Sequence, residues 1–299
     1  MYNGYMSKIN VLGASCIDIL VDRADRKEFF SGKYKADRIM TSFGGDALNE
    51  TVVLKALGND VSLSTILGDD PSGHMIAGFL KEKGIKVNGE IFRKDIDTYI
   101  SLVLIDESGE RNFVGSKNGS LRLYDLDDVR IDEDCRIVSF ASLFISQKLD
   151  DEKLTVLFKD IKKRNIILCA DSSSIKNHEY ALDMRCLSYI DYFFCNESEA
   201  KDLCRADDLP ECEKILKKAG IGNVIIKAGE KGCLYKGNFY PPEEKIVCVD
   251  STGAGDSFAA GFISALAKGE KIEACLANAN RCGGKACKYV GATAWTAHL

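Results

Sequence analysis

The sequence predicts an α/β protein with a mostly parallel central sheet, helices on both of its faces, and a small β-sheet beside it. The first observation is that short apolar runs alternate with amphipathic stretches along the 299 residues, as strands joined by crossover helices do. The second is that two segments, 17–41 and 91–116, interrupt this alternation with strand and turn patterns. Because no repeat or low-complexity linker divides the chain, we expect one domain over 1–299.

Apolar spacing and terminating residues define the elements of the first half. The run 8–15 predicts a strand that ends in a glycine turn. Residues 46–58 predict a helix, because apolar residues such as Leu48 and Val52 recur near helical spacing and Gly58 suits the position after a helix. By the same reasoning we expect strands at 61–68 and 136–142 and helices at 72–84 and 150–165.

The alternation continues in the second half. Strands are expected at 166–171, 189–196, 223–229 and 245–249, and helices at 197–204, 211–220, 256–268 and 271–288. In the segment 91–116, a turn at 107–110 separates two predicted strands. We expect this segment to pair with 17–41 as an antiparallel patch beside the main sheet.

Composition and charge exclude several classes of protein. A hydrophobic fraction of 45% and a charged fraction of 28% are typical of soluble globular chains. The net charge of −5 argues against a nucleic-acid-binding protein, which needs a clustered basic face. No apolar run approaches the roughly 18 residues that span a bilayer, and residues 1–20 do not have the pattern of a secretory signal. We therefore expect a cytoplasmic protein with no membrane or nucleic-acid partner.

The twelve cysteines are scattered along the chain. They form no Cys-x-x-Cys pair, and the Cys/His spacing of a zinc site is absent. Most lie inside apolar runs, so we expect small buried hydrophobic residues in a reducing compartment. The alternative is that one of them is a reactive or disulfide-forming thiol.

The segment 249–269 carries the clearest chemistry. Asp250 is followed by Gly253, Ala254 and Gly255, and a helix is predicted from Asp256. Small residues before a helix allow backbone N–H groups to converge on an anion. An alcohol kinase needs such donors for the transferring phosphoryl group, and a base for the hydroxyl proton. We interpret Asp256 as the base and the amides of 253–256 as the anion hole, although Asp256 could simply cap the helix.

Five motifs resemble those of one enzyme family. DSTGAGDSF (250–258) closely resembles the C-terminal signature of the ribokinase-like (PfkB) carbohydrate kinases. In chain order, the other four are GASCID (13–18), FGGDALNETVVLKALG (43–58), CNESEA (195–200) and IIKAGEKGC (225–233). The resemblance implies a ribokinase-like fold, ATP-dependent phosphorylation of a sugar hydroxymethyl group, and a β lid formed by approximately 17–41 and 91–116. Because lids of this family often mediate dimerisation, it also implies a homodimer.

The resemblance implies a sugar site at the lid side of the sheet. The residues that it assigns to the sugar are Asp18, Gly44, Gly45 and Asn49, with Tyr99, Ser101 and Arg111 facing the substrate from the lid. A carboxylate suits vicinal hydroxyls because it accepts several hydrogen bonds. The alternatives are a loop aspartate, a glycine turn before a helix, and a solvated charge on a hairpin.

The resemblance implies a nucleotide site formed by Asn196, Glu199, Lys227, Gly229, Gly232 and Asn280. Asn196 and Glu199 would organise Mg²⁺, which needs few carboxylates beside phosphate and water oxygens, and Asn280 would lie against adenine. As alternatives, Asn196 and Glu199 form a capping box, Lys227 is a surface lysine, and Asn280 is an ordinary helix residue. Asp250, Thr252, Ala286, Tyr289 and Gly291 match the K⁺ site that many members have, built largely from backbone carbonyls.

The substrate is less well defined by the sequence. Fructokinase-like members often show Asp-x-Asn-x-Arg at the end of the strand expected at 166–171; here Asp171 is kept, but Ser173 and Ile175 stand in place of the Asn and the Arg. The lid candidates Arg93, Lys94 and Arg111 do not form the cluster that a sugar phosphate needs. We therefore expect a free, fructose- or ribose-like sugar. A nucleoside kinase is the alternative, with Phe92, Tyr99 and Phe113 as base-stacking candidates. A non-catalytic sugar-binding relative is a third, although Asp256, Gly253 and Gly255 are intact.

Overall fold

The computed structural model describes residues 7–22, 35–105, 111–173 and 183–299. The predicted lid segments, 17–41 and 91–116, therefore run partly outside the described residues, at 23–34 and 106–110. Among the residues that the structure describes, no helix has the length and apolarity to cross a membrane.

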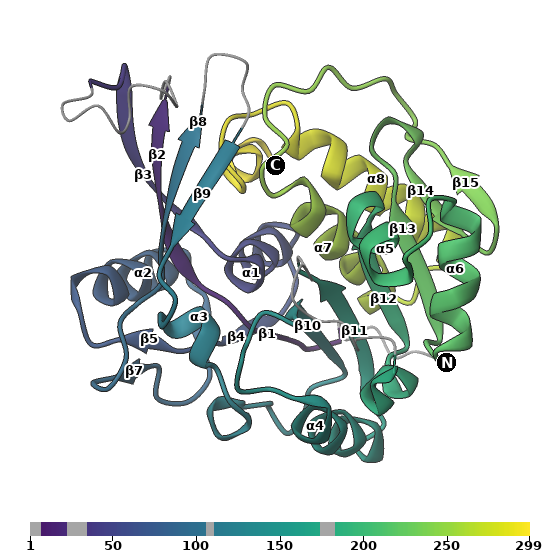
Figure 1. The fold of residues 1–299 in the computed structure, drawn as a ribbon, viewed down its shortest axis with the longest axis horizontal. Helices are drawn as coiled ribbons and strands as arrows, with labels where there is room; N and C mark the ends of the chain where they lie inside the picture. Colours follow the sequence, from purple (N-terminus) through teal and green to yellow (C-terminus); the bar gives the residue numbers. More distant parts are fainter. Residues whose placement is uncertain (1–6, 23–34, 106–110, 174–182) are drawn as a thin grey trace.

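The predicted central sheet is confirmed. Within the described residues it has nine strands in the order β15-β14-β13-β12-β11-β10-β1-β4-β6 (Figure 1). The strands are β1 (Ile9–Leu12), β4 (Val61–Ser64), β6 (Lys86–Val87), β10 (Ile137–Leu143), β11 (Ile167–Ser172), β12 (Tyr192–Asn196), β13 (Asn223–Lys227), β14 (Cys233–Tyr235) and β15 (Asn238–Tyr240). Pairing is parallel from β13 to β6 and antiparallel at the β14–β15 edge. Central strands such as β1 and β10 are buried along their whole length, as a sheet covered on both faces requires.

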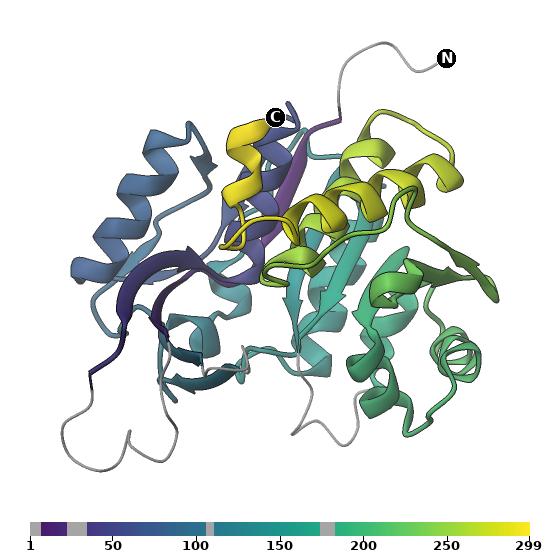
Figure 2. The same ribbon diagram turned by 90° about the horizontal axis from the view of Figure 1, so that it is seen from above.

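Helices cover both faces of this sheet, each over its own hydrophobic cluster. One face carries α1 (Asp46–Ala56), α2 (Pro71–Glu82), α7 (Ala254–Ala267) and α8 (Ile272–Ala286). The other carries α4 (Asp151–Lys163), α5 (Glu197–Cys204) and α6 (Leu209–Lys218). Figure 2 shows α7 and α8 side by side on their face of the sheet. The helix that supplies Asp256 is thus held by the core of the molecule and by its neighbour.

The lid is a second sheet of four described strands in the order β3-β2-β8-β9. They are β2 (Cys16–Asp22), β3 (Arg38–Gly44), β8 (Ile100–Ile105) and β9 (Arg111–Gly115), and they project beyond the main sheet (Figure 1). The two predicted segments do pair with each other, through β2 and β8. However, that pairing is parallel, with Asp18 opposite Ser101. The expectation of an antiparallel patch holds only within each segment, for β2–β3 and β8–β9.

The strand expected at 61–68 is split into β4 and the short strand β5 (Leu67–Gly68), which lies outside the main sheet. Two further differences concern the residues around 245–256. Residues 245–249 do not form a strand; Val247 and Val249 are exposed, and the Val249 N–H donates to the Cys287 carbonyl at 2.7 Å. The segment therefore runs along the end of α8 and pairs with no strand of the sheet. Helix α7 begins at Ala254, two residues before the predicted start, so Asp256 lies inside its first turn. All twelve cysteines lie in the described residues and are free, and ten of them are buried.

Short connections also shape the lid side. Strands β5 (Leu67–Gly68) and β7 (Phe92–Arg93) form a separate parallel pair. The short helix α3 (Ser120–Leu123) follows β9, and the 3₁₀ turn η1 (Leu126–Asp128) comes next. Further 3₁₀ turns are η3 (Arg185–Tyr189), η4 (Gly229–Lys231) and η5 (Ala294–His298). The turns η3 and η4 lie in loops between main elements, and η5 follows α8.

Asp132 binds side chains from the amino-terminal ends of three strands, β1, β4 and β6. It therefore lies at the opposite end of the sheet from the carboxyl ends of the strands. Its carboxylate accepts from Lys86 Nζ at 2.7 Å, Ser62 Oγ at 3.0 Å and Asn10 Nδ2 at 3.2 Å. Burial by itself would raise the pKa of Asp132, but the hydrogen bonds from Lys86, Asn10 and Ser62 outweigh it and hold that pKa well below its usual range.

Replacing Asp132 by asparagine is expected to lower the free energy of unfolding at pH 7 by about 1–3 kcal/mol, the range for a charged buried hydrogen-bonding group. Because the folded-state pKa is depressed, this contribution is present above the unfolded value near 4 and is lost as the pH falls below it. Urea unfolding at pH 7 and at about pH 3 measures the difference. Asp134→Asn, which removes an exposed partner of Lys8, is the control. An equal loss at both pH values would contradict the account.

Candidate functional site

A cleft of about 550 Å³ lies between the lid and the carboxyl ends of β11, β12 and β13. Parallel sheets bind ligands at this edge, where loops and helix starts converge. The lining residues come from the lid, from the strand ends and from the first turns of helices. They are Asp46, Tyr99, Ser101, Phe113, Leu121, Arg122, Phe144, Ile145, Asp171, Ser172, Ser173, Asn196, Glu199, Lys227, Gly255 and Asp256.

The start of α7 forms one wall of the cleft. Gly253 precedes the helix with φ +69°, and a Cβ there would lie 2.5 Å from the Ala292 carbonyl oxygen. Only glycine combines that conformation with that close approach. No side chain caps the helix. The Ala254 N–H donates to the Ser251 carbonyl at 3.2 Å, which leaves the N–H groups of Gly255 and Asp256 as the donors of the first turn without a partner among the described residues. An anion hole over 253–256 stays a prediction, and Gly255 and Asp256 supply the donors that the structure leaves open for it.

Asp256 lies in this first turn and meets α1. Asn49 Nδ2 donates to Asp256 Oδ2 at 2.7 Å, so the side chain expected on the sugar also positions the expected base. Burial and the nearby carboxylate of Asp46 raise the pKa of Asp256 to about 7, while the hydrogen bond from Asn49 opposes the shift. A carboxylate with such a pKa is suited to accept a proton near neutral pH.

Lys227 lies at the end of β13 and is not a surface lysine. Its Nζ donates to both carboxylate oxygens of Asp171, at 2.8 and 2.7 Å, and only 14% of its side chain is exposed. Burial by itself would lower the pKa of Lys227, but the charges of Asp171 and Glu199 raise it, so the ammonium is retained. Nζ would lie 3.2 Å from a Cβ on Gly255, so a positive charge sits directly beside the start of α7.

Asn196 and Glu199 form the capping box of α5. The Glu199 N–H donates to Asn196 Oδ1 at 2.8 Å, and the Asn196 N–H donates back to Glu199 Oε2 at 2.8 Å. Ser172 Oγ donates to the same carboxylate oxygen at 3.0 Å. The capping alternative is therefore confirmed, yet both residues also line the cleft. The described residues contain no group of three His, Cys, Asp or Glu that could hold a metal, but Mg²⁺ bound mainly by phosphate and water needs no such group.

The sugar-side residues surround the base of the lid. Gly44 faces Asp18 so closely that a Cβ would overlap that carboxylate. Asp18 pairs with Ser101 across β2 and β8, and Tyr99 and Ser101 line the cleft. Gly45 precedes α1. Arg111 belongs to β9, but its side chain lies outside what the structure describes.

The expected adenosine residues lie outside the lining of this cleft. Asn280 Nδ2 donates to the Tyr240 carbonyl at 2.8 Å, which gives this buried amide a structural partner. Gly229 and Gly232 form the turn between β13 and β14, and Gly232 packs against the backbone of Tyr240. Contact of these three residues with adenine stays a prediction.

The positions expected around K⁺ come together behind α7. Asp250 Oδ1 accepts from the N–H and hydroxyl of Thr252 at 2.9 and 2.7 Å, and Asp250 Oδ2 accepts from the Gly291 N–H at 2.9 Å. Tyr289 and Ala286 share the same turn, through a 3.2 Å backbone hydrogen bond. The carboxylate therefore fixes the loop that leads into α7, and K⁺ binding stays a prediction.

The structure adds residues that sequence reasoning did not select. Ser173 Oγ donates to Asp46 Oδ2 at 2.5 Å, and burial raises the pKa of Asp46. Asp171 pairs with Lys227, and Arg122 enters the cleft from α3. The sequence does offer a signal for two of these residues, because Asp46 follows a glycine pair and Asp171 ends an apolar run. Nothing in the sequence around Arg122 indicates a site.

Comparison with known proteins gives consistent matches over most of the chain. The model of the pfkB family carbohydrate kinases matches residues 6–297. The ribokinase of Dictyostelium discoideum is 26% identical over 282 residues, 86% of each chain. Among solved structures, the adenosine kinase from Sinorhizobium meliloti has a TM-score of 0.81 at 18% identity and covers 96% of both chains. A fructokinase double mutant from Vibrio cholerae O395, bound to fructose, ADP and potassium, has a TM-score of 0.81 at 17% identity, covering 98% of this chain and 96% of its own.

Gly253 and Gly255 are expected to differ sharply in their tolerance of a side chain. Gly253→Ala places a Cβ against the Ala292 backbone at positive φ, so it should destabilise the fold by more than about 1 kcal/mol. Gly255→Ala places its Cβ beside the flexible end of Lys227, so the melting temperature should change little. Thermal unfolding of the two variants compares them directly. Equal destabilisation would show that Gly255 is also needed for its backbone.

Proposed function

The chain belongs to the PfkB family of carbohydrate kinases, and from that premise we propose that it transfers the γ-phosphoryl group of ATP to the hydroxymethyl group of a free, fructose- or ribose-like sugar. The observation that carries the proposal is the first turn of α7. There Asp256, with a pKa of about 7, lies beside uncapped N–H groups in a cleft of about 550 Å³.

The reaction follows from this geometry. The hydroxymethyl oxygen attacks the γ-phosphorus in line while the bond to the β-phosphate oxygen breaks, and ADP leaves. Asp256 accepts the hydroxyl proton as the new O–P bond forms. The amides of 253–256 and the ammonium of Lys227 stabilise the charge on the phosphoryl oxygens. Asn49 keeps the Asp256 carboxylate in place through its 2.7 Å hydrogen bond.

The nucleotide is proposed to lie over the ends of β12 and β13, near Asn196, Glu199 and Lys227. The acidic side chains of this end, Asp46, Asp171, Glu199 and Asp256, outnumber its one lysine, so the donor set suits a divalent cation that arrives with the phosphates. Mg²⁺ would neutralise charge on the phosphate oxygens. A K⁺ ion at the Asp250 loop is proposed as well, because potassium is present in the Vibrio cholerae fructokinase of the same fold.

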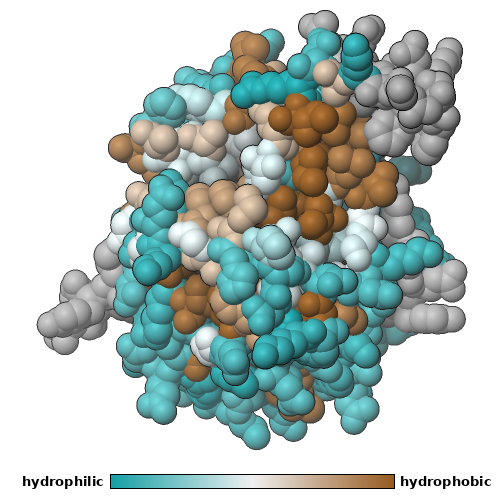
Figure 3. All heavy atoms as spheres, turned by 90° about the vertical axis from the view of Figure 1, so that its left-hand side faces the viewer, coloured by the Kyte–Doolittle hydropathy of each residue, from teal (hydrophilic) through white to brown (hydrophobic). Residues whose placement is uncertain are grey.

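The lid is proposed to cover the sugar and to form the homodimer contact. Tyr99 and Ser101 line the cleft from the lid, so bound sugar would be screened from water that could hydrolyse ATP. The lid strands also carry exposed apolar side chains that do not line the cleft: Ile39 is 68% exposed and Val114 55%. Figure 3 shows apolar atoms gathered on this side of the molecule. Such a patch supports association of two lids, and the proposed location of the enzyme is the cytoplasm.

A nucleoside kinase is the second candidate. Tyr99 and Phe113 line the cleft and could stack on a base, and the Sinorhizobium meliloti adenosine kinase has the same fold. Phe92 lies against His74, with 4.6 Å between ring centroids, and is not part of the cleft lining. The non-catalytic alternative would need a damaged base or anion hole, whereas Asp256, Gly253 and Gly255 are in place.

Asp256→Asn is expected to lower kcat about 10²- to 10⁴-fold, because it removes the general base, while sugar binding is retained. The measurement is ADP release from MgATP with fructose, ribose and adenosine, with and without K⁺, and sugar affinity by calorimetry. Asp134→Asn, at the opposite edge of the sheet, is the matched control. A fall of less than about tenfold would refute general-base catalysis by Asp256, and turnover with adenosine alone would favour the second candidate.

The pH dependence of kcat/KM is expected to follow Asp256. Because the base must be deprotonated, kcat/KM should rise with pH through about 7 and then level off. Asn49→Ala removes the hydrogen bond that stabilises the charged carboxylate, so it should move this rise to higher pH. Initial rates between pH 5.5 and 9 test both. A profile that is flat over this range, or an acid shift in Asn49→Ala, would contradict the assignment.

A further inference from the structure

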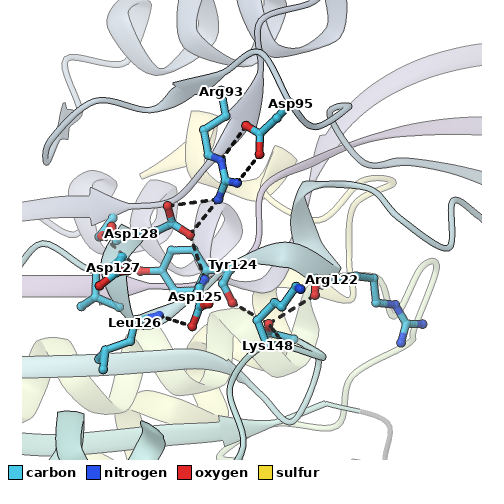
Figure 4. A network of polar contacts seen from close by, with 12 residues as sticks. Arg93, Asp95, Arg122, Tyr124, Asp125, Leu126, Asp127, Asp128 and Lys148 are labelled. Carbon is cyan, nitrogen blue, oxygen red and sulfur yellow. Dashed lines mark hydrogen bonds and ion pairs between the residues drawn. The ribbon is translucent and has the colours of Figure 1, made fainter.

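Arg122 is the lining residue that the proposed reaction leaves without a role. Its Nε is buried and has no hydrogen-bond partner. Among the described residues, no carboxylate forms an ion pair with its guanidinium. Figure 4 shows that the guanidinium points away from the neighbouring polar network of Arg93, Asp95 and Asp128. A buried donor without a partner is costly, more so when it is charged, and at a cleft wall a ligand can supply the missing acceptor.

The backbone around Arg122 is fixed from two sides. Its carbonyl accepts from the Gln147 N–H at 3.0 Å and from Ser146 Oγ at 3.3 Å, which ties α3 to the loop after β10. Two residues earlier, Ser120 Oγ accepts from the Tyr99 N–H at 3.1 Å. The guanidinium is therefore carried on a backbone that both the main sheet and the lid hold in position. A ligand that binds it meets a site that is already formed.

The position of Arg122 separates it from the phosphoryl-transfer end. Burial raises the pKa of the Tyr99 hydroxyl and the charge of Arg122 opposes that shift, so the guanidinium acts on the lid side of the cleft. Lys227, the other cation of the lining, is already paired with Asp171. Leu121, Phe144 and Ile145 are the apolar lining residues nearest to Arg122 in the chain or on its tethering loop. In the described lining, Arg122 is thus the cation left for the substrate.

We propose that Arg122 binds a carboxylate on the sugar, so that the substrate is a sugar acid with its hydroxymethyl group at the other end of the molecule. This rests on the proposed kinase function and narrows its substrate class. A guanidinium pairs with a carboxylate through two parallel hydrogen bonds. A phosphate monoester, with its higher charge, is better matched by two or three cations, whereas Arg122 is the single cation of the described lining that is not already paired with a carboxylate. Arg122 and Asp256 line the same cleft of about 550 Å³, so both side chains are open to one bound ligand.

The test compares each acid with its neutral amide, which keeps the shape and removes the charge. ADP release is measured with D-gluconate, 2-keto-3-deoxy-D-gluconate, the amide of each, fructose and fructose 6-phosphate. The wild type should prefer at least one acid over its amide by tenfold or more in kcat/KM. Arg122→Gln should lower kcat/KM for that acid roughly 10- to 100-fold and abolish the preference. Arg122→Lys should restore part of it, which a merely structural role would not do.

Arg136→Gln is the matched control, because Arg136 is exposed at the amino-terminal end of β10 and only donates to the Cys135 carbonyl. It should keep the preference for the acid. Thermal unfolding of Arg122→Gln verifies that the variant is folded. Should it be unfolded, Arg122→Lys and Arg122→Met are compared in its place.

Several outcomes would overturn the proposal while leaving the kinase function intact. These are equal use of acid and amide by the wild type, an undiminished preference in Arg122→Gln, and a preference for fructose 6-phosphate that depends on Arg122. If no compound causes ADP release, the kinase proposal fails. Calorimetric titration of the acids and amides in the absence of ATP then tests separately whether Arg122 binds a carboxylate. Binding of an acid but not its amide, weakened in Arg122→Gln, would support the carboxylate site, and absence of such binding would refute it.

Discussion

The ion pair between Lys227 and Asp171 is the interaction on which the charged end of the cleft depends. Burying either group alone would be costly, and an unpartnered acid beside Asp256 would add to the negative charge there. The pair is nearly enclosed, with 14% and 5% of the two side chains exposed. Gly255 lies beside this pair: Nζ would be 3.2 Å from a Cβ at that position, and the flexible end of Lys227 can give way by the small distance that an alanine there requires.

Helix α1 carries polar side chains near this ion pair. Asp46 and Asn49 on its first turn reach Ser173 and Asp256, respectively. Glu50, the next residue, is fully buried and accepts from Ser139 Oγ at 2.6 Å, and burial raises its pKa well above the usual range. A helix that packs against the sheet thus carries three polar residues on its inner side. The hydrogen bond from Asn49 joins it to α7, so the Asp256 carboxylate is held by two helices that start at the same edge.

Sequence patterns within a short segment were sufficient to predict the central sheet and the start of the helix that carries Asp256 to within two residues. Glycines and a carboxylate between an apolar run and a helix placed Gly253 and Asp256, and strand alternation placed the central sheet. The predictions failed where long-range contacts decide the outcome. Residues 245–249 have a strand-like composition but bond to the end of α8. Arg122 enters the cleft because Ser146 and Gln147 hold its backbone, a contact across more than twenty residues that no sequence spacing reveals.

The two ends of the cleft differ in charge, and this difference would orient a sugar acid. At the proposed phosphoryl-transfer end, Asp46, Glu199 and Asp256 would repel a carboxylate, whereas a hydroxymethyl group can donate to them. At the proposed acid-binding end, Arg122 would attract the carboxylate and would offer a hydroxymethyl group no comparable partner. The reversed orientation therefore combines like-charge repulsion with an unsatisfied guanidinium. The preference for the orientation with the carboxylate at Arg122 would therefore come from the repulsion that disfavours the reversed orientation as much as from the ion pair that favours the proposed one.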